Sequence, residues 1–232
     1  MMMHNRIYSF ILKSAISLLL LTATQQAMAA SHKQSNTEAK HDSIPLLRGI
    51  AVSADIVGLV QRMVSDYGQY EAALRVNLKD KWFPVAELGL GTADADDPTT
   101  KLCYKTSAPY GKLGLDFNIA KNKHDDYRIY AGVRYAMTYY KFDVSSHDIN
   151  DPIWGDPANY EAKGVKANCH WAELVFGVDA KIVKPLRLGW SFRYRRRLMH
   201  DDGNIGNTWY VPGYGRQGST RLAGTFNVIF EL

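Results

Sequence analysis

A stretch of alternating residues from 127 to 140 is the feature that most constrains the fold of this chain. Mostly apolar side chains take every second position, and the positions between them carry two arginines, small residues, a tyrosine and a threonine. Such alternation predicts a β-strand with one apolar face. Strands of soluble proteins are usually about 5–6 residues long, whereas a strand tilted across a bilayer needs about 9–11. The length of the stretch therefore favours a membrane-spanning strand.

Seven further segments repeat this period. The eight predicted strands are 48–61, 69–78, 83–92, 110–120, 127–140, 170–182, 186–197 and 220–232. An even number of such strands predicts an all-β, antiparallel up-and-down transmembrane barrel. Short turns alternate with three long connections, at 93–109, 141–168 and 198–218. This asymmetry is expected when the turns face the periplasm and the long loops face outside.

The beginning of the chain predicts export. Residues 1–29 combine early positive charge, an apolar segment at 14–24 and a small-x-small site at 27–29, which is the pattern of a cleaved signal peptide. The polar residues 30–46 then predict a periplasmic linker, and 47–232 the barrel. Because no later apolar run is long enough for a transmembrane helix, we expect the mature protein in the outer membrane.

Charge and composition argue against several kinds of ligand. The formal net charge is +5, and the basic residues are dispersed along strands, so we expect no nucleic-acid partner. The motif His124-Asp125-Asp126 and the motif at 200–202 fall on opposite sides of the predicted membrane. The acidic run at 94–97 lacks the central glycine and closing glutamate of an EF-hand. We therefore predict no metal site and no cofactor.

The polar faces of the strands carry many charges of both signs. By parity the lumen is expected to hold Asp55, Glu71, Glu87, Asp116, Glu173 and Asp179 together with Arg75, Lys112, Arg128, Arg134, Lys181, Arg187, Arg193, Arg195 and Arg221. The main charge network is predicted to comprise Glu87, Arg128, Arg134, Glu173, Asp179, Arg187, Arg193, Arg195 and Arg221. A filled, ion-paired interior is favoured, since about eight strands leave room only for side chains. The alternative is a narrow, porin-like, anion-preferring pore lined by arginines.

The sequence supports an enzyme less well than it supports a filled barrel or a pore. Some outer-membrane enzymes carry a histidine near the barrel rim, and His200 is the candidate for a hydrolase or acyltransferase here. No serine at the rim of the seventh predicted strand completes a catalytic triad with it. We therefore predict that the protein is not an enzyme.

The two cysteines, Cys103 and Cys169, are both predicted to lie on the outer side of the membrane. Two cysteines in neighbouring loops of an exported protein suggest a disulfide. Two separate thiols remain the alternative. A bridge is expected to stiffen the exposed surface.

Three short motifs carry a resemblance to known proteins. They are PVAELGLG at 84–91, ELVFG at 173–177 and VPGYG at 211–215. On these the chain resembles the small eight-stranded outer-membrane proteins of Gram-negative bacteria, and in particular an uncharacterised Bacteroidota family of unknown function. The resemblance implies an outer-membrane location and a barrel fold. It implies no reaction.

The favoured role is that of a structural or binding barrel whose long loops face a partner. That partner would be lipopolysaccharide, another outer-membrane protein or a surface lipoprotein. Buried aromatic residues dominate the energetics of interfaces. The predicted loop anchors are Tyr104, Trp154, Tyr160, Trp209, Tyr210 and Tyr214.

Overall fold

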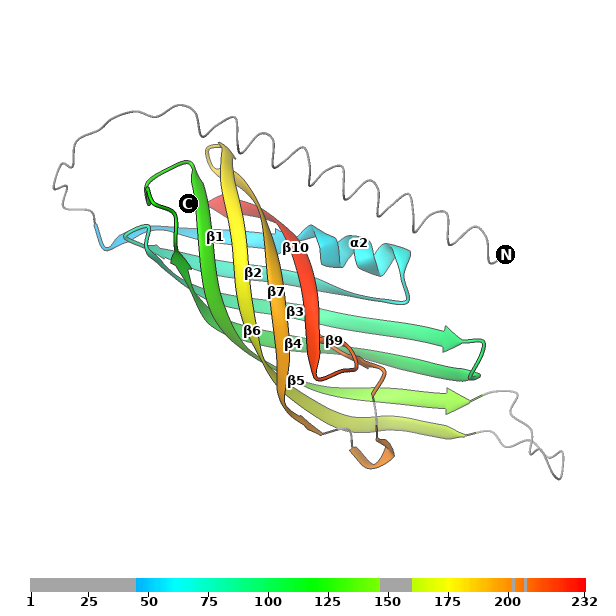
Figure 1. Ribbon diagram of the computed structural model, residues 1–232. Coiled ribbons are helices and arrows are strands. Elements are labelled where there is room, and N and C mark those ends of the chain that lie inside the picture. Colours follow the sequence, from blue (N-terminus) through cyan, green and yellow to red (C-terminus); the bar gives the residue numbers. More distant parts are fainter. Residues whose placement is uncertain (1–44, 147–159, 202, 207) are drawn as a thin grey trace, which may run out of the picture. The chain divides into compact units, whose positions relative to one another are not determined.

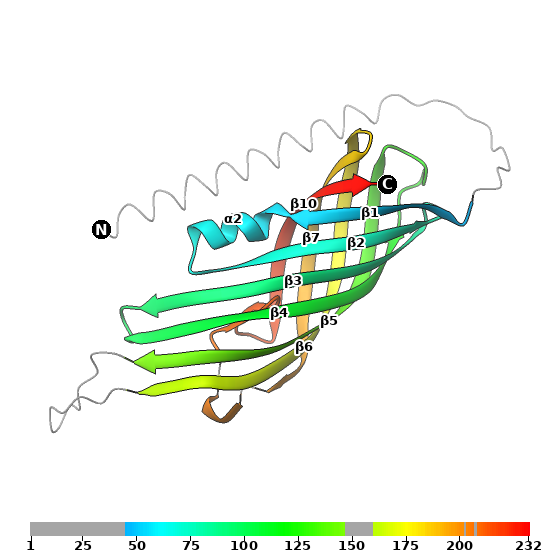
Figure 2. The ribbon, with the colours of Figure 1, turned by 180° about the vertical axis from the view of Figure 1, so that it is seen from behind.

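The computed structural model describes residues 45–146, 160–201, 203–206 and 208–232. The predicted signal peptide and nearly all of the linker lie outside these residues. Eight strands close into an antiparallel barrel in the order β1-β10-β7-β6-β5-β4-β3-β2 (Figures 1 and 2). They are β1 (Leu47–Asp55), β2 (Tyr67–Leu78), β3 (Trp82–Asp97), β4 (Leu102–Asn118), β5 (Tyr127–Ser146), β6 (Glu161–Val183), β7 (Leu186–Asp201) and β10 (Thr220–Glu231). Each strand pairs with its neighbour in the chain and the first pairs with the last, so the predicted up-and-down barrel is confirmed.

The prediction of the first strand is wrong for the second half of its range. The chain leaves β1 at Asp55 and forms helix α2 (Ile56–Val64). The Asp55 carboxylate accepts hydrogen bonds from the amides of Val57 and Gly58, both at 3.1 Å, and so caps the helix. A short apolar run such as IVGLV does not distinguish a strand from a helix by period. The acidic cap in front of it favours the helix.

Strands β3 to β6 extend past their neighbours at one end of the barrel (Figure 1). β6 has 23 residues, whereas β1 has 9. The predicted loop at 93–109 is therefore also wrong, because most of it continues β3 and β4, and Asp97 lies opposite Leu102. Beyond the bilayer the outward face meets water, so its side chains are polar, as Asp94 and Lys105 are. The alternation is thereby reversed, because the buried side chains there, such as Ala93 and Tyr104, are mostly apolar. Only residues 98–101 connect the two strands.

The two ends of the barrel differ in their connections. At one end a tight turn joins β2 to β3, with Lys79 at φ 55° and Asp80 at φ 54°, the left-handed geometry that hairpin turns favour. At the other end the β7–β10 connection contains η1 (Gly203–Ile205), β8 (Tyr210–Val211) and β9 (Gly215–Arg216). Long connections mark the extracellular end of such barrels.

Neither of the helices found in the described parts of the chain is long and apolar enough to cross a membrane.

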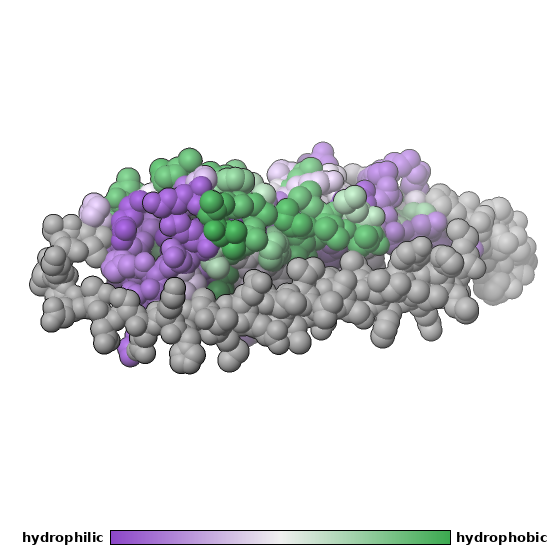
Figure 3. All heavy atoms as spheres, turned by 90° about the horizontal axis from the view of Figure 1, so that it is seen from above, coloured by the Kyte–Doolittle hydropathy of each residue, from purple (hydrophilic) through white to green (hydrophobic). Residues whose placement is uncertain are grey.

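The outward faces of the strands are apolar and exposed. The exposed fractions of Leu88, Leu113, Leu174 and Leu222 lie between 59 % and 72 %. On the face seen in Figure 3, apolar surface occupies the middle and hydrophilic surface lies toward both ends. A soluble barrel with a ligand-binding interior would bury such side chains and expose charged ones, and here the pattern is inverted. The strands close into a ring, as lipid requires, with β1 paired to β10 over Ala51–Asp55.

Aromatic residues border the apolar band. At the outer border, the hydroxyl groups of Tyr135 and Tyr139 lie 2.8 and 3.3 Å from the ring nitrogens of His170. Tyr127 marks the inner border of the same strand and is 38 % exposed. At about 3.3 Å per residue and a tilt of about 40°, Tyr127 and Tyr139 are separated by about 30 Å along the membrane normal. This matches a bilayer, and an even-stranded antiparallel barrel of this kind is the outer-membrane type. The protein is an outer-membrane β-barrel.

Candidate functional site

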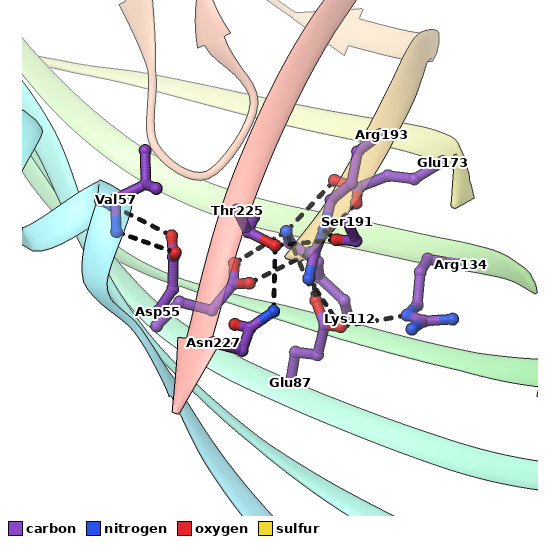
Figure 4. A network of polar contacts seen from close by, with 12 residues as sticks. Asp55, Val57, Glu87, Lys112, Arg134, Glu173, Ser191, Arg193, Thr225 and Asn227 are labelled. Atoms are coloured by element: carbon purple, nitrogen blue, oxygen red, sulfur yellow. Dashed lines mark hydrogen bonds and ion pairs between the residues drawn. The ribbon is translucent and has the colours of Figure 1, made fainter. Parts of the chain in front are cut away.

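The centre of the lumen holds three carboxylates around two cations (Figure 4). Lys112 Nζ lies 2.8 Å from Glu71 Oε2 and 3.2 Å from Glu173 Oε1. Arg193 Nη1 lies 2.7 Å from Glu87 Oε2 and 3.1 Å from Glu71 Oε1. All five side chains are buried, and each comes from a different strand. Burial of these charges is tolerable because each carboxylate touches both cations.

Two further arginines flank this cluster. Arg134 Nε lies 3.1 Å from Glu87 Oε1, and its Nη2 donates to Asp116 Oδ2 at 2.9 Å. Arg195 Nε lies 3.0 Å from Glu173 Oε1. Opposite charges therefore continue on both sides of the central group. The structure brings these predicted lumen residues together in one network.

Glycine makes room for the arginines in this crowded interior. A Cβ at Gly114 would stand 2.3 Å from Arg134 Cδ, and a Cβ at Gly132 would stand 1.9 Å from Asp116 Oδ1. Neither contact is possible without moving the Arg134–Asp116 pair. The lumen-facing glycines thus leave the space that the side chains of the charge network occupy.

The network continues to the periplasmic end. Asp179 receives Arg187 Nε at 2.7 Å and Arg75 Nη1 at 2.9 Å. Glu231, near the end of the last strand, receives Arg128 Nη2 at 2.7 Å and lies 3.4 Å from Arg187 Nη1. Our list of lumen charges missed Glu231. Its parity with the inward-facing residues of the same strand was the signal that would have found it.

Asp80 closes the periplasmic end, in the turn between β2 and β3. Burial acts to raise the pKa of this carboxyl, but hydrogen bonds from Asn77 and His124 and the charges of Arg48 and Arg128 outweigh it, so the pKa is lowered. The Asp80 backbone amide also donates a hydrogen bond to the Asn77 side-chain oxygen at 2.9 Å. The turn is thereby tied to the lumen network.

The extracellular half of the lumen is filled differently, by a plug that the chain itself supplies. Residues 208–217 of the β7–β10 connection fold inward, and Tyr210, Val211 and Tyr214 are at most 2 % exposed. Tyr104 donates to the Tyr210 carbonyl at 2.7 Å, and Arg195 Nη1 donates to the Tyr214 carbonyl at 3.0 Å. The plug and the charge network are therefore directly bonded. Together they place buried side chains at the periplasmic end, in the middle and at the extracellular end of the lumen.

Three predicted surface anchors are wrong for this reason. Tyr104, Tyr210 and Tyr214 lie in the aromatic core of the plug, not on a surface. The inner walls at this level are small, as Gly91 shows: a Cβ there would meet Pro212 at 2.7 Å. Small wall residues leave space that aromatic side chains from a distant loop must fill, and that was the available signal.

The other predicted anchors have mixed positions. Tyr160 is 46 % exposed, beside the start of β6. Trp209 is half-buried and packs edge-on against Tyr67 at 5.6 Å between ring centroids. Trp154 lies outside the described residues. Of the predicted network, Arg221 stands apart at the rim, where its guanidinium donates to the carbonyls of residues 216 and 217 in the plug.

The predicted disulfide is also wrong. Cys103 and Cys169, both within the described residues, are thiols that no disulfide joins. Cys103 pairs with Ser145 and Cys169 with Thr138, positions seven residues apart along β5, or about 23 Å at about 3.3 Å per residue. Cys103 is part of the outward face of β4, whereas Cys169 is fully buried. No bridge can span that distance.

His200 contacts the plug. Its Nδ1 lies 3.0 Å from the Asn168 carbonyl, and its Nε2 lies 3.4 Å from Thr208 Oγ1. Thr208 is buried and receives a hydrogen bond from the Tyr140 hydroxyl at 3.1 Å. These contacts fasten the plug to the wall. Among the described residues, no group of three or more His, Cys, Asp or Glu side chains is arranged to hold a metal ion.

Comparison with known proteins gives a family without a function. A sequence family described as "Domain of unknown function (DUF6048)" matches residues 8–231. The chain belongs to the DUF6048 family. The family description assigns no bacterial group, so the link to Bacteroidota stays a prediction. No curated protein matches the chain.

Solved structures of outer-membrane proteins match the chain at low identity. The N-terminal β-barrel domain of Pseudomonas aeruginosa OprF is 12% identical with a TM-score of 0.42, over 79% of this chain and 97% of that one. A major outer membrane protein from Thermus thermophilus is 15% identical, with a TM-score of 0.42, over 79% and 98%. Acinetobacter baumannii CarO2 is 13% identical, with a TM-score of 0.40, over 81% and 99%.

Proposed function

We propose that this DUF6048 protein is a non-enzymatic, non-conducting barrel that serves as a structural or binding component of the outer membrane. The observation that carries the proposal is the doubly closed lumen. Ion pairs fill the middle and the periplasmic end, and the plug fills the extracellular end. The arginines expected to line an anion pore, such as Arg193 and Arg195, are neutralised by carboxylates at 2.7–3.5 Å. This arrangement supports a rigid scaffold over a channel.

The projecting hairpins are the surface we assign to a partner. Beyond the bilayer the outward faces of β3 to β6 carry charges of both signs, such as the Lys105–Asp94 pair at 3.1 Å. Lys163 and Glu161 form a second exposed pair at the start of β6, next to the exposed Tyr160. An exposed aromatic residue with polar neighbours is typical of a protein interface. We therefore propose a protein partner, either a surface lipoprotein or another outer-membrane protein.

Planar-bilayer conductance of refolded protein tests the closed lumen. We expect no steady conductance, with heat-modifiable migration on gels showing that the barrel is folded. The variants Arg193→Ala and Arg195→Ala are expected to be silent too, because each removes one side chain from a packed interior. Steady anion-biased conductance that these substitutions reduce would make the protein a pore and end the proposal.

Site-specific photocrosslinking in native outer membranes tests the partner surface. A photoreactive residue at position 160 is expected to give a discrete protein adduct. The same residue at position 113, where Leu113 faces lipid and is 65 % exposed, serves as the matched control. Adducts of equal yield at both positions would contradict a binding role for the hairpins.

A further inference from the structure

A groove lies on the outer wall of the barrel, where α2 meets β2. Its volume is about 380 Å³, and its lining residues are Ala54, Asp55, Leu59, Tyr70, Glu71, Ala72 and Leu88. Ala54 lies opposite Ala72 on the neighbouring strand, and Ala72 lies opposite Leu88. The two alanines form a low floor, and Leu59 of α2 and the exposed side chains of Tyr70 and Leu88 border it.

The groove is apolar despite its two acidic residues. The Asp55 carboxylate caps α2 and also accepts a hydrogen bond from the Phe226 amide at 3.1 Å. The Glu71 carboxylate points into the lumen, where it pairs with Lys112 at 2.8 Å. Both acidic groups are therefore engaged on the lumen side. The surface that an occupant of the groove can contact is therefore formed by methyl groups and apolar side chains.

Helix α2 creates the groove by taking the place of a strand. Within the described barrel, β1 pairs with β10 only over Ala51–Asp55, whereas β10 pairs with β7 from Thr220 to Phe230. Beside the part of β10 that precedes this pairing, the wall continues as α2 (Figure 2). A helix is wider than a strand, and Leu59 of α2 borders the alanine floor.

Two glycines allow the helix to pack closely against β2. A Cβ at Gly68 would lie 2.5 Å from the Arg62 amide nitrogen, and a Cβ at Gly58 would lie 2.6 Å from the Gln69 carbonyl oxygen. On its free side α2 exposes apolar residues, among them Val64 at 61 %. The groove therefore opens onto the lipid-facing surface and is continuous with it.

We propose that this groove binds one acyl chain of lipopolysaccharide in the outer leaflet. The groove opens into hydrocarbon, and an unfilled depression there forfeits dispersion contacts along its walls. α2 belongs to the extracellular half of the barrel, which places the groove in the outer leaflet.

Charge complementarity favours lipopolysaccharide as the source of the chain. Arg62 lies in the last turn of α2. Leu59, which lines the groove, precedes Arg62 by three residues, so both side chains lie on the same side of α2. Arg62, at the end of the helix that borders the groove, suits the phosphates of a lipid whose acyl chain enters the groove.

Native mass spectrometry of the barrel, extracted from outer membranes in mild detergent, tests the proposal. Wild-type protein is expected to retain one lipopolysaccharide molecule. Ala72→Leu fills the floor and is expected to lower retention about tenfold, which corresponds to about 1.4 kcal/mol of binding free energy. Ala131→Leu adds the same side chain to the outward face of β5, away from the groove, and is expected to retain lipid like the wild type.

Two further comparisons make each outcome decisive. Leu59→Ala removes one border without adding volume, so it reports on the groove even if Ala72→Leu does not fold on heat-modifiability gels. Arg62→Gln is expected to weaken retention of lipopolysaccharide and to leave retention of phospholipid unchanged. Equal lipid retention in wild type, Leu59→Ala and Ala72→Leu would overturn the site. Retention of phospholipid in place of lipopolysaccharide would overturn the assigned occupant.

Discussion

Replacement of Arg193 by methionine is the most direct test of the lumen network. The guanidinium lies within 3.5 Å of three buried carboxylates, those of Glu71, Glu87 and Glu173. Methionine retains much of the side-chain length but removes the charge and the hydrogen bonds. The three carboxylates then share Lys112 as their common cation, and part of their negative charge is uncompensated.

The expected loss of stability is large. Removal of one partner from a buried ion pair costs about 3–5 kcal/mol, because the other charge stays buried. For an unfolding slope of about 2 kcal/mol/M in urea, a loss of about 4 kcal/mol lowers the midpoint by about 2 M. The assay is urea unfolding of the barrel in lipid vesicles, followed by loss of the heat-modifiable band. Arg196→Met, at an exposed position on the same strand, serves as the control and is expected to change the stability by less than about 0.5 kcal/mol.

A second substitution separates charge from packing. Glu87→Gln removes one of the carboxylates that Arg193 neutralises, so the double variant is expected to recover about 1–3 kcal/mol relative to additivity. A lost packing contact would not be recovered in this way. An Arg193→Met midpoint within about 0.3 M of wild type, or strictly additive single substitutions, would refute the account of an ion-paired core.

Three further predictions concern the plug, the thiols and the periplasmic turn. Gly213→Ala is expected to release the plug, since φ is +79° there and a Cβ would lie 2.4 Å from an aromatic ring. Gly206→Ala is the control, because Gly206 has a similar φ of +80° and open space around the added Cβ. Extracellular protease should cut the loop in the first variant and not in the second. On intact cells a maleimide reagent should label the half-buried Cys103 and leave the fully buried Cys169 unlabelled until the barrel unfolds, and a mobility change on reduction would contradict separate thiols. Asp80 has a lowered pKa, so its contribution to stability is present above the ordinary carboxyl pKa of 3.8 and is lost as the pH falls through the lower folded value. The stability advantage of wild type over Asp80→Asn should therefore shrink below about pH 4, and an advantage that does not change with pH would contradict the bonding described for the turn.

The membrane-spanning parts of the barrel were readable from sequence because lipid imposes a strict rule. Residues on one face of each strand must suit hydrocarbon, so alternation at 127–140 identified β5 and its lumen-facing arginines. The same parity placed Glu87, Glu173 and Arg193 inside. Where water replaces lipid the rule no longer applies, and the extension of β3 and β4 through 93–109 was therefore read as a loop.

The remaining features depend on contacts between residues far apart in the chain. Tyr210 donates to the Gly68 carbonyl at 3.1 Å across 142 positions, and no local pattern indicates that this loop folds inward. The switch from β1 to α2 at Asp55 also involves β10, since the carboxylate that caps the helix accepts a hydrogen bond from the Phe226 amide across 171 positions. Local alternation and the composition of each face thus determined the strands, their inward charges and the membrane. The plug, the separate thiols and the helix-bordered groove were decided by tertiary packing, because each arises from volume that distant segments leave or fill.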